Sequence, residues 1–329
     1  MTTLACVICG NGYGHLKRTL SIVEHLHQVR PDVAITLYVD HQHHAKIARR
    51  ASFAHIESLH LPLKWFTSGH AYADGAVFKA TRQTLATLPL TDYDLVYTDN
   101  LVEPLFTTQQ VVLGSSFLWH DVLHSAYPEV PTIQHYYDTI ENLLDAHRQP
   151  MLANRYFQMP HLSTVTEVIP IGMISFVEPD GVPHTPPHNI LLAPGNSSAV
   201  PELLTLITPD LRRLVEQGYT LKAGAEWQSY LFDLGVPSTA HDFGSFAGVD
   251  AVITRAGIGS VSDCITSRLP MLLIPDSNPE IRYNQSVIKA SGLGFDLVDF
   301  ETFDISPERF ATFSLDGVID AVRYLEGCL

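Results

Sequence analysis

The stretch LACVICGNGYGHLKRTL, residues 4–20, places an apolar run, a glycine-rich loop and a helical pattern in immediate succession. Such an apolar run is typical of a strand that is buried on both faces of a sheet. From His15 to Arg30 the apolar residues recur at helical spacing, and Pro31 ends the pattern. The stretch therefore predicts a parallel strand whose loop leads straight into a helix, the first half of a βαβ unit.

The same alternation of strand and helix continues along the chain. We expect strands at 33–39, 54–59, 93–99, 110–116, 189–195, 219–224, 238–243, 248–257 and 270–276, and helices at 42–51, 132–148, 201–217, from about 260, and 280–291. This pattern predicts an α/β protein with parallel sheets covered by helices on both faces.

One segment interrupts the alternation. EPDGVPHTPPH, residues 178–188, has four prolines and one glycine, a composition typical of a linker. We therefore expect two doubly wound, Rossmann-like domains, at 1–177 and 189–329. Ligands of such folds bind at the carboxyl ends of the strands, and with two domains also in the cleft between them.

Composition limits the partners of the chain. The formal net charge of −15 over 329 residues argues against broad nucleic-acid binding. No apolar run is long enough for a membrane-spanning helix, which leaves only peripheral membrane contact open. The start of the chain has no leader pattern, and Cys6 and Cys9 lie inside the expected first strand, facing opposite sides. We expect a cytoplasmic protein without a redox or metal role for these cysteines.

The opening loop does not fit the dinucleotide fingerprint GxGxxG. After Gly10 and Gly12 the third glycine comes one place early, at Gly14, and His15 occupies the place of the fingerprint glycine. No acidic residue near position 35 replaces the missing signal, although Asp40, at the end of the second expected strand, is at a plausible distance for a ribose contact. The loop is either a simple strand–helix turn or a place where another molecule approaches the backbone and the imidazole.

Two cations follow in the first turn of the helix. Lys17 and Arg18 stand where a helix favours anions by roughly 0.3–1 kcal/mol. Such cations are either solvated or placed to meet a phosphate.

The second informative stretch is DAVITRAGIGSVSDCITSRLPMLLIP, residues 250–275. A buried strand ends at Thr254–Arg255, and Gly257 and Gly259 precede or begin a helix. Ser260 and Asp263 have the spacing of a capping box, which stabilises a helix start by roughly 1 kcal/mol. The alternative is that the glycines and the helix N-terminus cradle a diphosphate and Asp263 binds ribose hydroxyls. Local sequence leaves both interpretations open.

Three motifs together carry a resemblance to a known family. GNGYGHLKR after the first strand, ILLAPGNSS at 190–198, and the stretch at 250–275 continuing to PDSNPEIRYN resemble the GT-B glycosyltransferases in order and spacing. The chain looks similar to the family 28 type, which includes the N-acetylglucosaminyltransferase of peptidoglycan synthesis. The resemblance covers the whole chain. It implies two Rossmann-like domains facing across a cleft, an acceptor domain first and a nucleotide-sugar domain second.

The resemblance also implies an activity. It implies transfer of a sugar, with inversion and without an obligatory metal, from a nucleotide-diphospho-sugar, most simply a UDP-sugar, to a hydroxyl acceptor. No cofactor is implied beyond this donor substrate.

The resemblance assigns roles residue by residue. His15 would be the general base, a task that suits an imidazole with its ordinary pKa of about 6.5. Asp99, which ends the strand at 93–99, would orient the acceptor or help His15, or else be a plain strand-end turn. The donor would contact Gly12, Gly14, Gly195, Asn196, Ser197, Phe243, Arg255, Gly257, Gly259, Ser260, Asp263, Glu280 and Asn284. Phe243 would pack on the base, or be a core residue.

Three positions depart from the family pattern. Pro194 removes a backbone N–H from the loop that begins the second half. Asp263 replaces the usual glutamate and is one methylene shorter. Ile281 stands where a polar residue would hold a sugar hydroxyl, so either Glu280 and Asn284 hold the sugar differently or the sugar lacks that hydroxyl.

Other functions remain alternatives at this stage. A nucleotide-sugar hydrolase would use the same scaffold with water as the acceptor, although the Trp- and Tyr-bearing segment 59–78 favours an acceptor wall. A non-catalytic nucleotide-sugar-binding protein and a nicotinamide oxidoreductase are also open. The cluster His41, His43 and His44 lacks the i, i+4 spacing of paired helical ligands, so we expect no metal site there.

Overall fold

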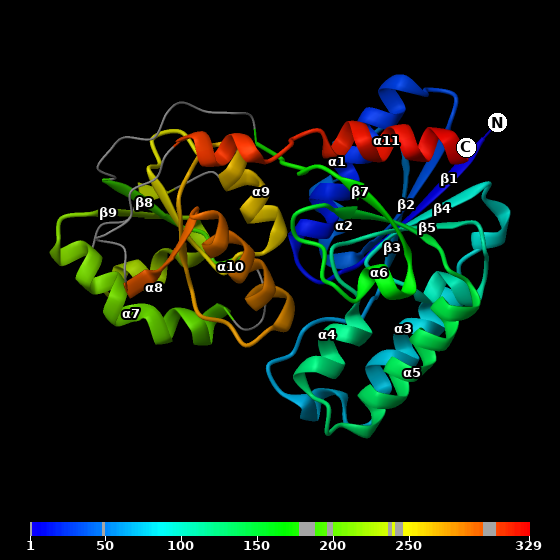
Figure 1. Ribbon diagram of the computed structural model, residues 1–329, viewed down its shortest axis with the longest axis horizontal. Coiled ribbons are helices and arrows are strands. Elements are labelled where there is room, and N and C mark those ends of the chain that lie inside the picture. The colour runs from blue at the N-terminus through cyan, green and yellow to red at the C-terminus, as the bar shows by residue number, and fades with distance from the viewer. Residues whose placement is uncertain are drawn as a thin grey trace. The chain divides into compact units, whose positions relative to one another are not determined.

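The computed structural model describes residues 2–47, 50–177, 188–195, 200–235, 239–240, 246–298 and 307–329. The chain forms two compact units (Figure 1). Unit 1 comprises Met1–Met173, Asn278–Glu280 and Asp316–Leu329, and unit 2 comprises Ile174–Ser277 and Ile281–Leu315. Each unit contains one parallel sheet with helices packed on it.

The sheet of unit 1 has seven strands in the order β3-β2-β1-β4-β5-β6-β7, all paired in parallel. The strands are β1 (Thr3–Ile8), β2 (Ala34–Asp40), β3 (His55–Leu59), β4 (Leu95–Asp99), β5 (Val111–Gly114), β6 (Pro150–Asn154) and β7 (Glu167–Ile171). The helices are α1 (Tyr13–Val29), α2 (His41–Ile47), α3 (Ala76–Ala86), α4 (Trp119–Ala126), α5 (Pro131–Ala146), α6 (Leu162–Val165) and α11 (Gly317–Cys328). The order reverses between β1 and β4, which makes this the switch point of the sheet.

The sheet of unit 2 repeats this order. Its six strands run β10-β9-β8-β11-β12-β13 and are also parallel. They are β8 (Asn189–Leu192), β9 (Thr220–Ala223), β10 (Thr239–Ala240), β11 (Ala251–Thr254), β12 (Met271–Leu273) and β13 (Gly294–Asp296), with helices α7 (Val200–Glu216), α8 (Gln228–Phe232), α9 (Ile258–Thr266) and α10 (Pro279–Ser291). The switch point of unit 2 lies between β8 and β11.

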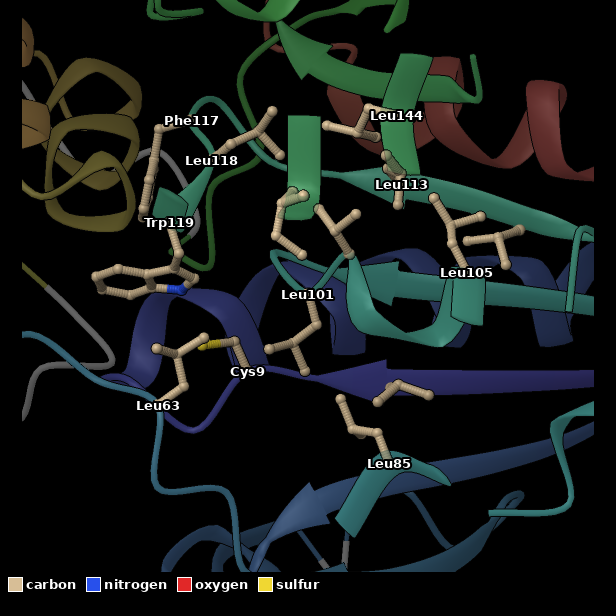
Figure 2. Close-up of a cluster of buried hydrophobic side chains, with 14 of the residues drawn as sticks. Cys9, Leu63, Leu85, Leu101, Leu105, Leu113, Phe117, Leu118, Trp119 and Leu144 are labelled. Atoms are coloured by element: carbon tan, nitrogen blue, oxygen red, sulfur yellow. The ribbon is translucent and has the colours of Figure 1, made fainter. Parts of the chain in front are cut away.

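The core of unit 1 shows why the opening stretch folds as it does. Within β1 the residues from Leu4 to Ile8 are buried, because helices cover both faces of the sheet. Cys9 continues this run into a hydrophobic cluster with Leu63 and Trp119, part of which is drawn in Figure 2. Burial raises the pKa of the Cys9 thiol to about 12. Such a thiol is not a thiolate at neutral pH, the form that reacts in thiol–disulfide chemistry.

The sequence predictions of doubly wound sheets are confirmed, but several details differ. The segments at 150–154, 167–171 and 294–296 form strands, and those at 76–86 and 119–126 form helices, that the alternation did not indicate. The second domain was expected to continue to residue 329, whereas α11 belongs to unit 1. There Gly172 N–H donates to Asp320 Oδ2 at 3.0 Å, and Gly317 N–H donates to the carbonyl of Met173 at 3.2 Å. These contacts and the packing of α11 on α1 fix the helix to unit 1.

The expected linker and the expected lack of a membrane-spanning helix can be compared only with the described residues. Of the expected linker, residues 178–187 lie outside the described residues. Among the residues described, no helix is both long enough and apolar enough to cross a bilayer.

Candidate active site

The switch point of unit 1 brings together two side chains that are 84 residues apart in the chain. His15 lies in the first turn of α1, directly after the loop that follows β1. Asp99 is the last residue of β4, the strand next to β1. His15 Nδ1 lies 2.7 Å from Asp99 Oδ1. The topology therefore joins the two residues that the sequence analysis proposed as catalytic, at the sheet edge where ligands of this fold class bind.

The carboxylate of Asp99 is completely buried, and both of its oxygens accept hydrogen bonds. Arg18, one turn after His15 on α1, donates its Nε–H to Asp99 Oδ2 at 2.8 Å and its Nη2 to Asp99 Oδ1. Thr19 Oγ1 donates to Asp99 Oδ2 at 3.1 Å. The guanidinium of Arg18 is thus part of the site, and its side chain is only 13% exposed. The expectation that Arg18 is solvated is therefore wrong, and the alternative that it meets a phosphate stays a prediction.

The charges of the site settle the protonation state of Asp99. Burial by itself would raise the pKa of Asp99, but the charge of Arg18 and the contact with His15 lower it below its ordinary value. Asp99 is therefore ionised at neutral pH and accepts hydrogen bonds from every neighbour.

An ionised Asp99 also determines the tautomer of His15. A carboxylate can only accept, so Nδ1 of His15 carries the proton and donates it to Asp99. Arg18 Nη2, which lies 3.2 Å from the same nitrogen, is then a close neighbouring donor and not a partner. Nε2 of His15 keeps its lone pair and is the nitrogen that can take up a proton. This is the base–orienter arrangement of histidine–aspartate catalytic pairs.

A loop after β5 completes the surroundings of the imidazole. The centroid of the Phe117 ring lies 6.2 Å from the centroid of the His15 ring. Asn100, which follows Asp99, has a left-handed backbone with φ of 60°. With its amide oriented to satisfy its neighbours, Asn100 donates to the carbonyl of Phe117 at 2.9 Å and accepts from Trp119 Nε1 at 3.2 Å. Asn100 and Phe117 were not among the expected site residues. The one signal in the sequence was for Asn100, a polar residue directly after a strand-end aspartate.

Two positions of the loop before α1 require glycine, for different reasons. A Cβ on Gly10 would lie 2.9 Å from the Cβ of Asp40, so Gly10 permits the packing of strand ends. Gly12 caps α1 with φ of 82° and ψ of 179°, a conformation essentially restricted to glycine. A Cβ there would meet no atom within 4 Å, so the backbone lies open. The backbone at Gly12, directly before α1, is therefore open enough for a ligand to approach, and a donor contact at Gly14 stays a prediction.

Asp40 does not match a ribose-binding carboxylate. It is 3% exposed and accepts from Gln42 N–H through Oδ1 and from Leu61 N–H through Oδ2, both at 3.1 Å. Both oxygens thus hold backbone, which argues against the dinucleotide alternative. Neighbouring His43 is also buried, and burial lowers the pKa of its imidazole.

In unit 2 the loops after β8 and β11 occupy the corresponding switch point. Gly195, after β8, has φ of 82°, and a Cβ there or on Gly257 would meet no atom within 4 Å. Gly257 caps α9, with Gly259 and Ser260 in the first helical turn. Backbone N–H groups at this helix end are therefore open to a ligand. Asn196, Ser197 and Phe243 lie outside the described residues.

Asp263 is not part of a capping box. Helix α9 begins at Ile258 and its N-cap, Gly257, has no side-chain cap, so Ser260 is already inside the helix. Instead, Asp263 Oδ1 accepts from Phe176 N–H at 2.8 Å and from Ser175 Oγ at 3.0 Å. The carboxylate thus ties helix α9 to the first residues of unit 2. The capping interpretation is wrong, and the ribose interpretation stays a prediction.

The loop after β11 is held by side chains of its own unit. Arg255 is 6% exposed, and its Nε donates to Asp276. Asn284 Nδ2 donates to the carbonyl of Ala256 at 3.0 Å. Gln285 Nε2 donates to the carbonyls of Arg255 and Ile274, at 3.1 Å and 2.7 Å. Ala256 has a left-handed φ of 73°, so these contacts fix a strained loop directly before α9.

Helix α10 places the remaining predicted donor residues. Asn278 caps it by accepting from Glu280 N–H at 2.9 Å. Glu280 is 8% exposed and Asn284 1% exposed. Ile281, the departure from the family pattern, is buried, which explains an apolar residue at this position.

Comparison with known structures turns this arrangement into a fold assignment. The glycotransferase of kitacinnamycin matches with a TM-score of 0.61 and 16% identity, over 99% of this chain and 94% of that one. CalG4, the calicheamicin glycosyltransferase, matches with a TM-score of 0.64 and 16% identity, over 100% of this chain and 98% of that one. The fold is GT-B.

A third similar structure was solved with a nucleotide. It is a UDP-glucose: anthocyanidin 3-O-glucosyltransferase in complex with UDP, with a TM-score of 0.59 and 9% identity, over 99% of this chain and 94% of that one. Comparison with models of protein families and with curated protein sequences finds no match. At these identities the likeness establishes the GT-B fold, and activity has to be argued from the site.

Proposed function

We propose that the chain is an inverting glycosyltransferase of the family 28 type, with His15 as general base and Asp99 as the residue that orients it. The observation that supports this most is the buried His15–Asp99 contact at the switch point of a GT-B fold. A base that keeps its Nε2 lone pair directed away from its carboxylate partner suits removal of a proton from a hydroxyl.

In the proposed reaction, Nε2 of His15 takes the proton of the acceptor hydroxyl. The hydroxyl oxygen forms a bond to the anomeric carbon of the donor sugar as the bond from that carbon to the diphosphate oxygen breaks. One displacement inverts the anomeric configuration, and the nucleoside diphosphate leaves with the bonding electrons. Because Arg18 already balances the charge of Asp99, the aspartate serves mainly to fix the tautomer and ring orientation of His15.

The donor is proposed to bind the loops of unit 2. The open space beside Gly195 and Gly257, with Gly259 and Ser260 in the first turn of α9, suits a diphosphate, for which helix N–H groups would replace a metal ion. Arg255 and Asn284 hold the loop before α9. Asp263, Glu280, Asn196, Ser197 and Phe243 remain predicted donor contacts. The similar structure solved with UDP makes a UDP-sugar the first donor to test.

Hydrolysis of a nucleotide sugar is the second candidate. Trp65 and Tyr72, the aromatic residues that suggested an acceptor wall in segment 59–78, are 2% and 0% exposed and belong to the core of unit 1. The acceptor-wall interpretation is therefore wrong for these two residues. Release of free sugar from the donor without any acceptor would favour the hydrolase.

The test combines binding with turnover. Calorimetric titration with UDP, GDP, dTDP, CMP and NAD⁺ identifies the nucleotide, and the matching nucleotide sugars are then assayed for nucleotide release with a panel of hydroxyl acceptors. His15→Ala is expected to keep nucleotide affinity and to lower kcat by about 10²–10⁴-fold, the usual contribution of a general base. His25→Ala, on the same helix, is the matched control.

Three outcomes would overturn the proposal in different ways. Binding of NAD⁺ alone contradicts the transferase. Unchanged turnover in His15→Ala contradicts the base. Retention of anomeric configuration in the product, measured by NMR, contradicts the single displacement.

A further inference from the structure

Two histidines and a glutamate converge on one point of unit 1, apart from the His15–Asp99 pair. His120 lies in the first turn of α4, Glu141 lies in α5, and His161 directly precedes α6. Nε2 of His120 lies 2.7 Å and Nε2 of His161 lies 2.8 Å from the same atom, Glu141 Oε1. The three ligand-type atoms all lie within 4.8 Å of one another. Three separate segments thus direct potential metal ligands at one place.

The hydroxyl of Thr164 indicates which nitrogen of His161 carries its proton. Thr164 Oγ1 lies 2.7 Å from the carbonyl oxygen of His161, and this close contact takes the hydroxyl hydrogen. The same oxygen lies 3.3 Å from Nδ1 of His161 and can then only accept from it. A neutral His161 therefore has its proton on Nδ1, and its bare Nε2 faces the carboxylate oxygen of Glu141. Two lone pairs at 2.8 Å repel each other unless a positive charge lies between them.

The surroundings of the cluster suit a metal ion as that charge. His120 is 1% exposed, and Nδ1 of its ring has no partner among the described residues, so the Nε2 contact to Glu141 fixes the ring. The side chains of Glu141 and His161 are 25% and 24% exposed, which leaves one side open to water. Tyr137 packs beside both histidine rings, at 5.4 Å and 6.2 Å between centroids. One side of the cluster is therefore rigid and the other accessible.

We propose that His120, Glu141 and His161 bind a divalent transition-metal ion, with Zn²⁺ as the best match. Two imidazole nitrogens and one carboxylate oxygen, with a fourth position open to water, form a typical zinc ligand set. Ligands about 2.0–2.1 Å from a tetrahedral zinc lie roughly 3.3 Å apart, so the two contacts have to lengthen by about half an ångström. The partly exposed side chains of Glu141 and His161 permit that shift. Thr164, by accepting from Nδ1 of His161, takes the outer position that orients zinc-binding histidines.

Such an ion would cross-link α4, α5 and the turn before α6. Helix α4 begins two residues after Phe117, whose ring lies near His15. Metal binding is thus placed to stabilise the wall of the candidate active site without touching the reacting atoms. The inference does not depend on the proposed transferase activity.

The test uses the full chain, stripped of metal with a chelator, and titration with Zn²⁺ against a competing chromophoric chelator. We expect one tight site per chain and a rise in Tm on addition of Zn²⁺. Bound Co²⁺ should give a visible absorption band that is more intense than the band of Co²⁺ in water, as in four-coordinate sites. Glu141→Gln and His161→Ala should each weaken binding by at least about ten-fold and abolish the rise in Tm. Thr164→Val should weaken binding by a smaller factor, up to about ten-fold.

The chain has 17 histidines, so weak adventitious binding needs a matched control. Asp40, His41 and His60 form the other described group with metal-like spacing, and two of these side chains are exposed. His41→Ala and His60→Ala should leave the tight site unchanged. The proposal is overturned if the wild-type chain has no stoichiometric site, or if the tight site survives both Glu141→Gln and His161→Ala. Circular dichroism of each variant separates loss of metal from loss of fold.

Discussion

The two units have the same strand order and use their switch points differently. In unit 1 the side chains at the switch point contact one another, and the buried Asp99 holds both His15 and Arg18. In unit 2 Arg255 pairs with Asp276, but the other polar side chains mainly hold the backbone, as with Asn284 on the carbonyl of Ala256 and Asp263 on Phe176 N–H. One switch point presents an oriented imidazole and the other presents an oriented loop. The difference indicates that one topology can preorganise either a reactive group or a set of backbone donors.

The loop after β4 in unit 1 and the loop after β11 in unit 2 each contain a non-glycine residue with a left-handed backbone. In unit 1 it is Asn100, which tolerates this conformation and uses its amide on Phe117 and Trp119. In unit 2 it is Ala256, which has no polar side chain to compensate. The strain in unit 2 is thus supported from outside the residue, by Asn284.

Removing the guanidinium of Arg18, which neutralises the buried Asp99, is expected to have the largest effect on stability. Arg18→Ala leaves the carboxylate of Asp99 buried without its charged partner, and such changes cost about 3–5 kcal/mol of unfolding free energy. Denaturant unfolding measures the loss, and hydrogen exchange should locate it in β1, β4 and α1. A loss of less than 1 kcal/mol would contradict the view that Arg18 is a structural part of the pair.

The tether of unit 2 is expected to have an intermediate effect. Asp263→Ala removes a charged acceptor from Phe176 N–H and Ser175 Oγ, which should lower the free energy of unfolding by about 1.5–3 kcal/mol. Ser175→Ala keeps the carboxylate and should cost only about 1 kcal/mol. If Asp263 also binds ribose, Asp263→Ala weakens UDP binding measured by calorimetry, whereas Ser175→Ala leaves it unchanged. Equal UDP affinity in both variants would assign Asp263 to the tether alone.

A second buried carboxyl of unit 1 gives a pH-dependent contrast with Asp99. Glu103 is 3% exposed, and burial raises its pKa above the ordinary value of 4.5, although Tyr136 donates to its Oε1 at 2.9 Å. A raised folded-state pKa means that the folded chain holds this proton more tightly, so stability falls as pH rises above 4.5 through the folded pKa.

Glu103→Gln removes this pH dependence. We expect the variant to be more stable than wild type at neutral pH and nearly equal to it below pH 4.5, where the glutamate is protonated in both states. Thermal unfolding over a pH series measures the difference. Asp99 contributes to the pH dependence of stability with the opposite sign. Its pKa is lowered in the folded state, so its contribution to stability is present above its ordinary pKa of 3.8 and is lost on acidification. A Glu103→Gln variant that is less stable than wild type at neutral pH, but equal to it below pH 4.5, would show that the carboxylate is needed in its charged form.

The smallest expected effect compares the two left-handed residues. Ala256→Gly relieves a φ of 73° and should raise the free energy of unfolding by up to about 1 kcal/mol. Asn100→Gly relieves no comparable strain and loses the amide contacts, so it should lower the value by about 1–2 kcal/mol. Denaturant unfolding of both variants gives the comparison. The same sign for both would contradict the distinction between the loops.

The sequence predicted the alternation of elements well because it depends on local periodicity. Helix α1 ends at Val29, as the apolar spacing and Pro31 required, and β1 and β4 lie where their apolar runs indicated. The opening loop also singled out His15, whereas Asp99 came only through a resemblance, since no local pattern links residues 84 apart. Their catalytic roles stay a prediction. The pairing of Arg18 with Asp99 and the tether at Asp263 depend on tertiary contacts, so first-turn charge and capping rules failed at both.

The return of α11 to unit 1 has a consequence for protein engineering. Apart from the short segment Asn278–Glu280, the chain leaves unit 1 after Met173 and returns to it at Asp316, so unit 1 is discontinuous in sequence. A gene cut at a single point between the units would give an N-terminal fragment without the helix that packs on α1, with Arg155 missing its salt bridge to Asp320. Recombination of this scaffold with a relative therefore requires two crossover points, so that residues 316–329 are inherited together with residues 1–173.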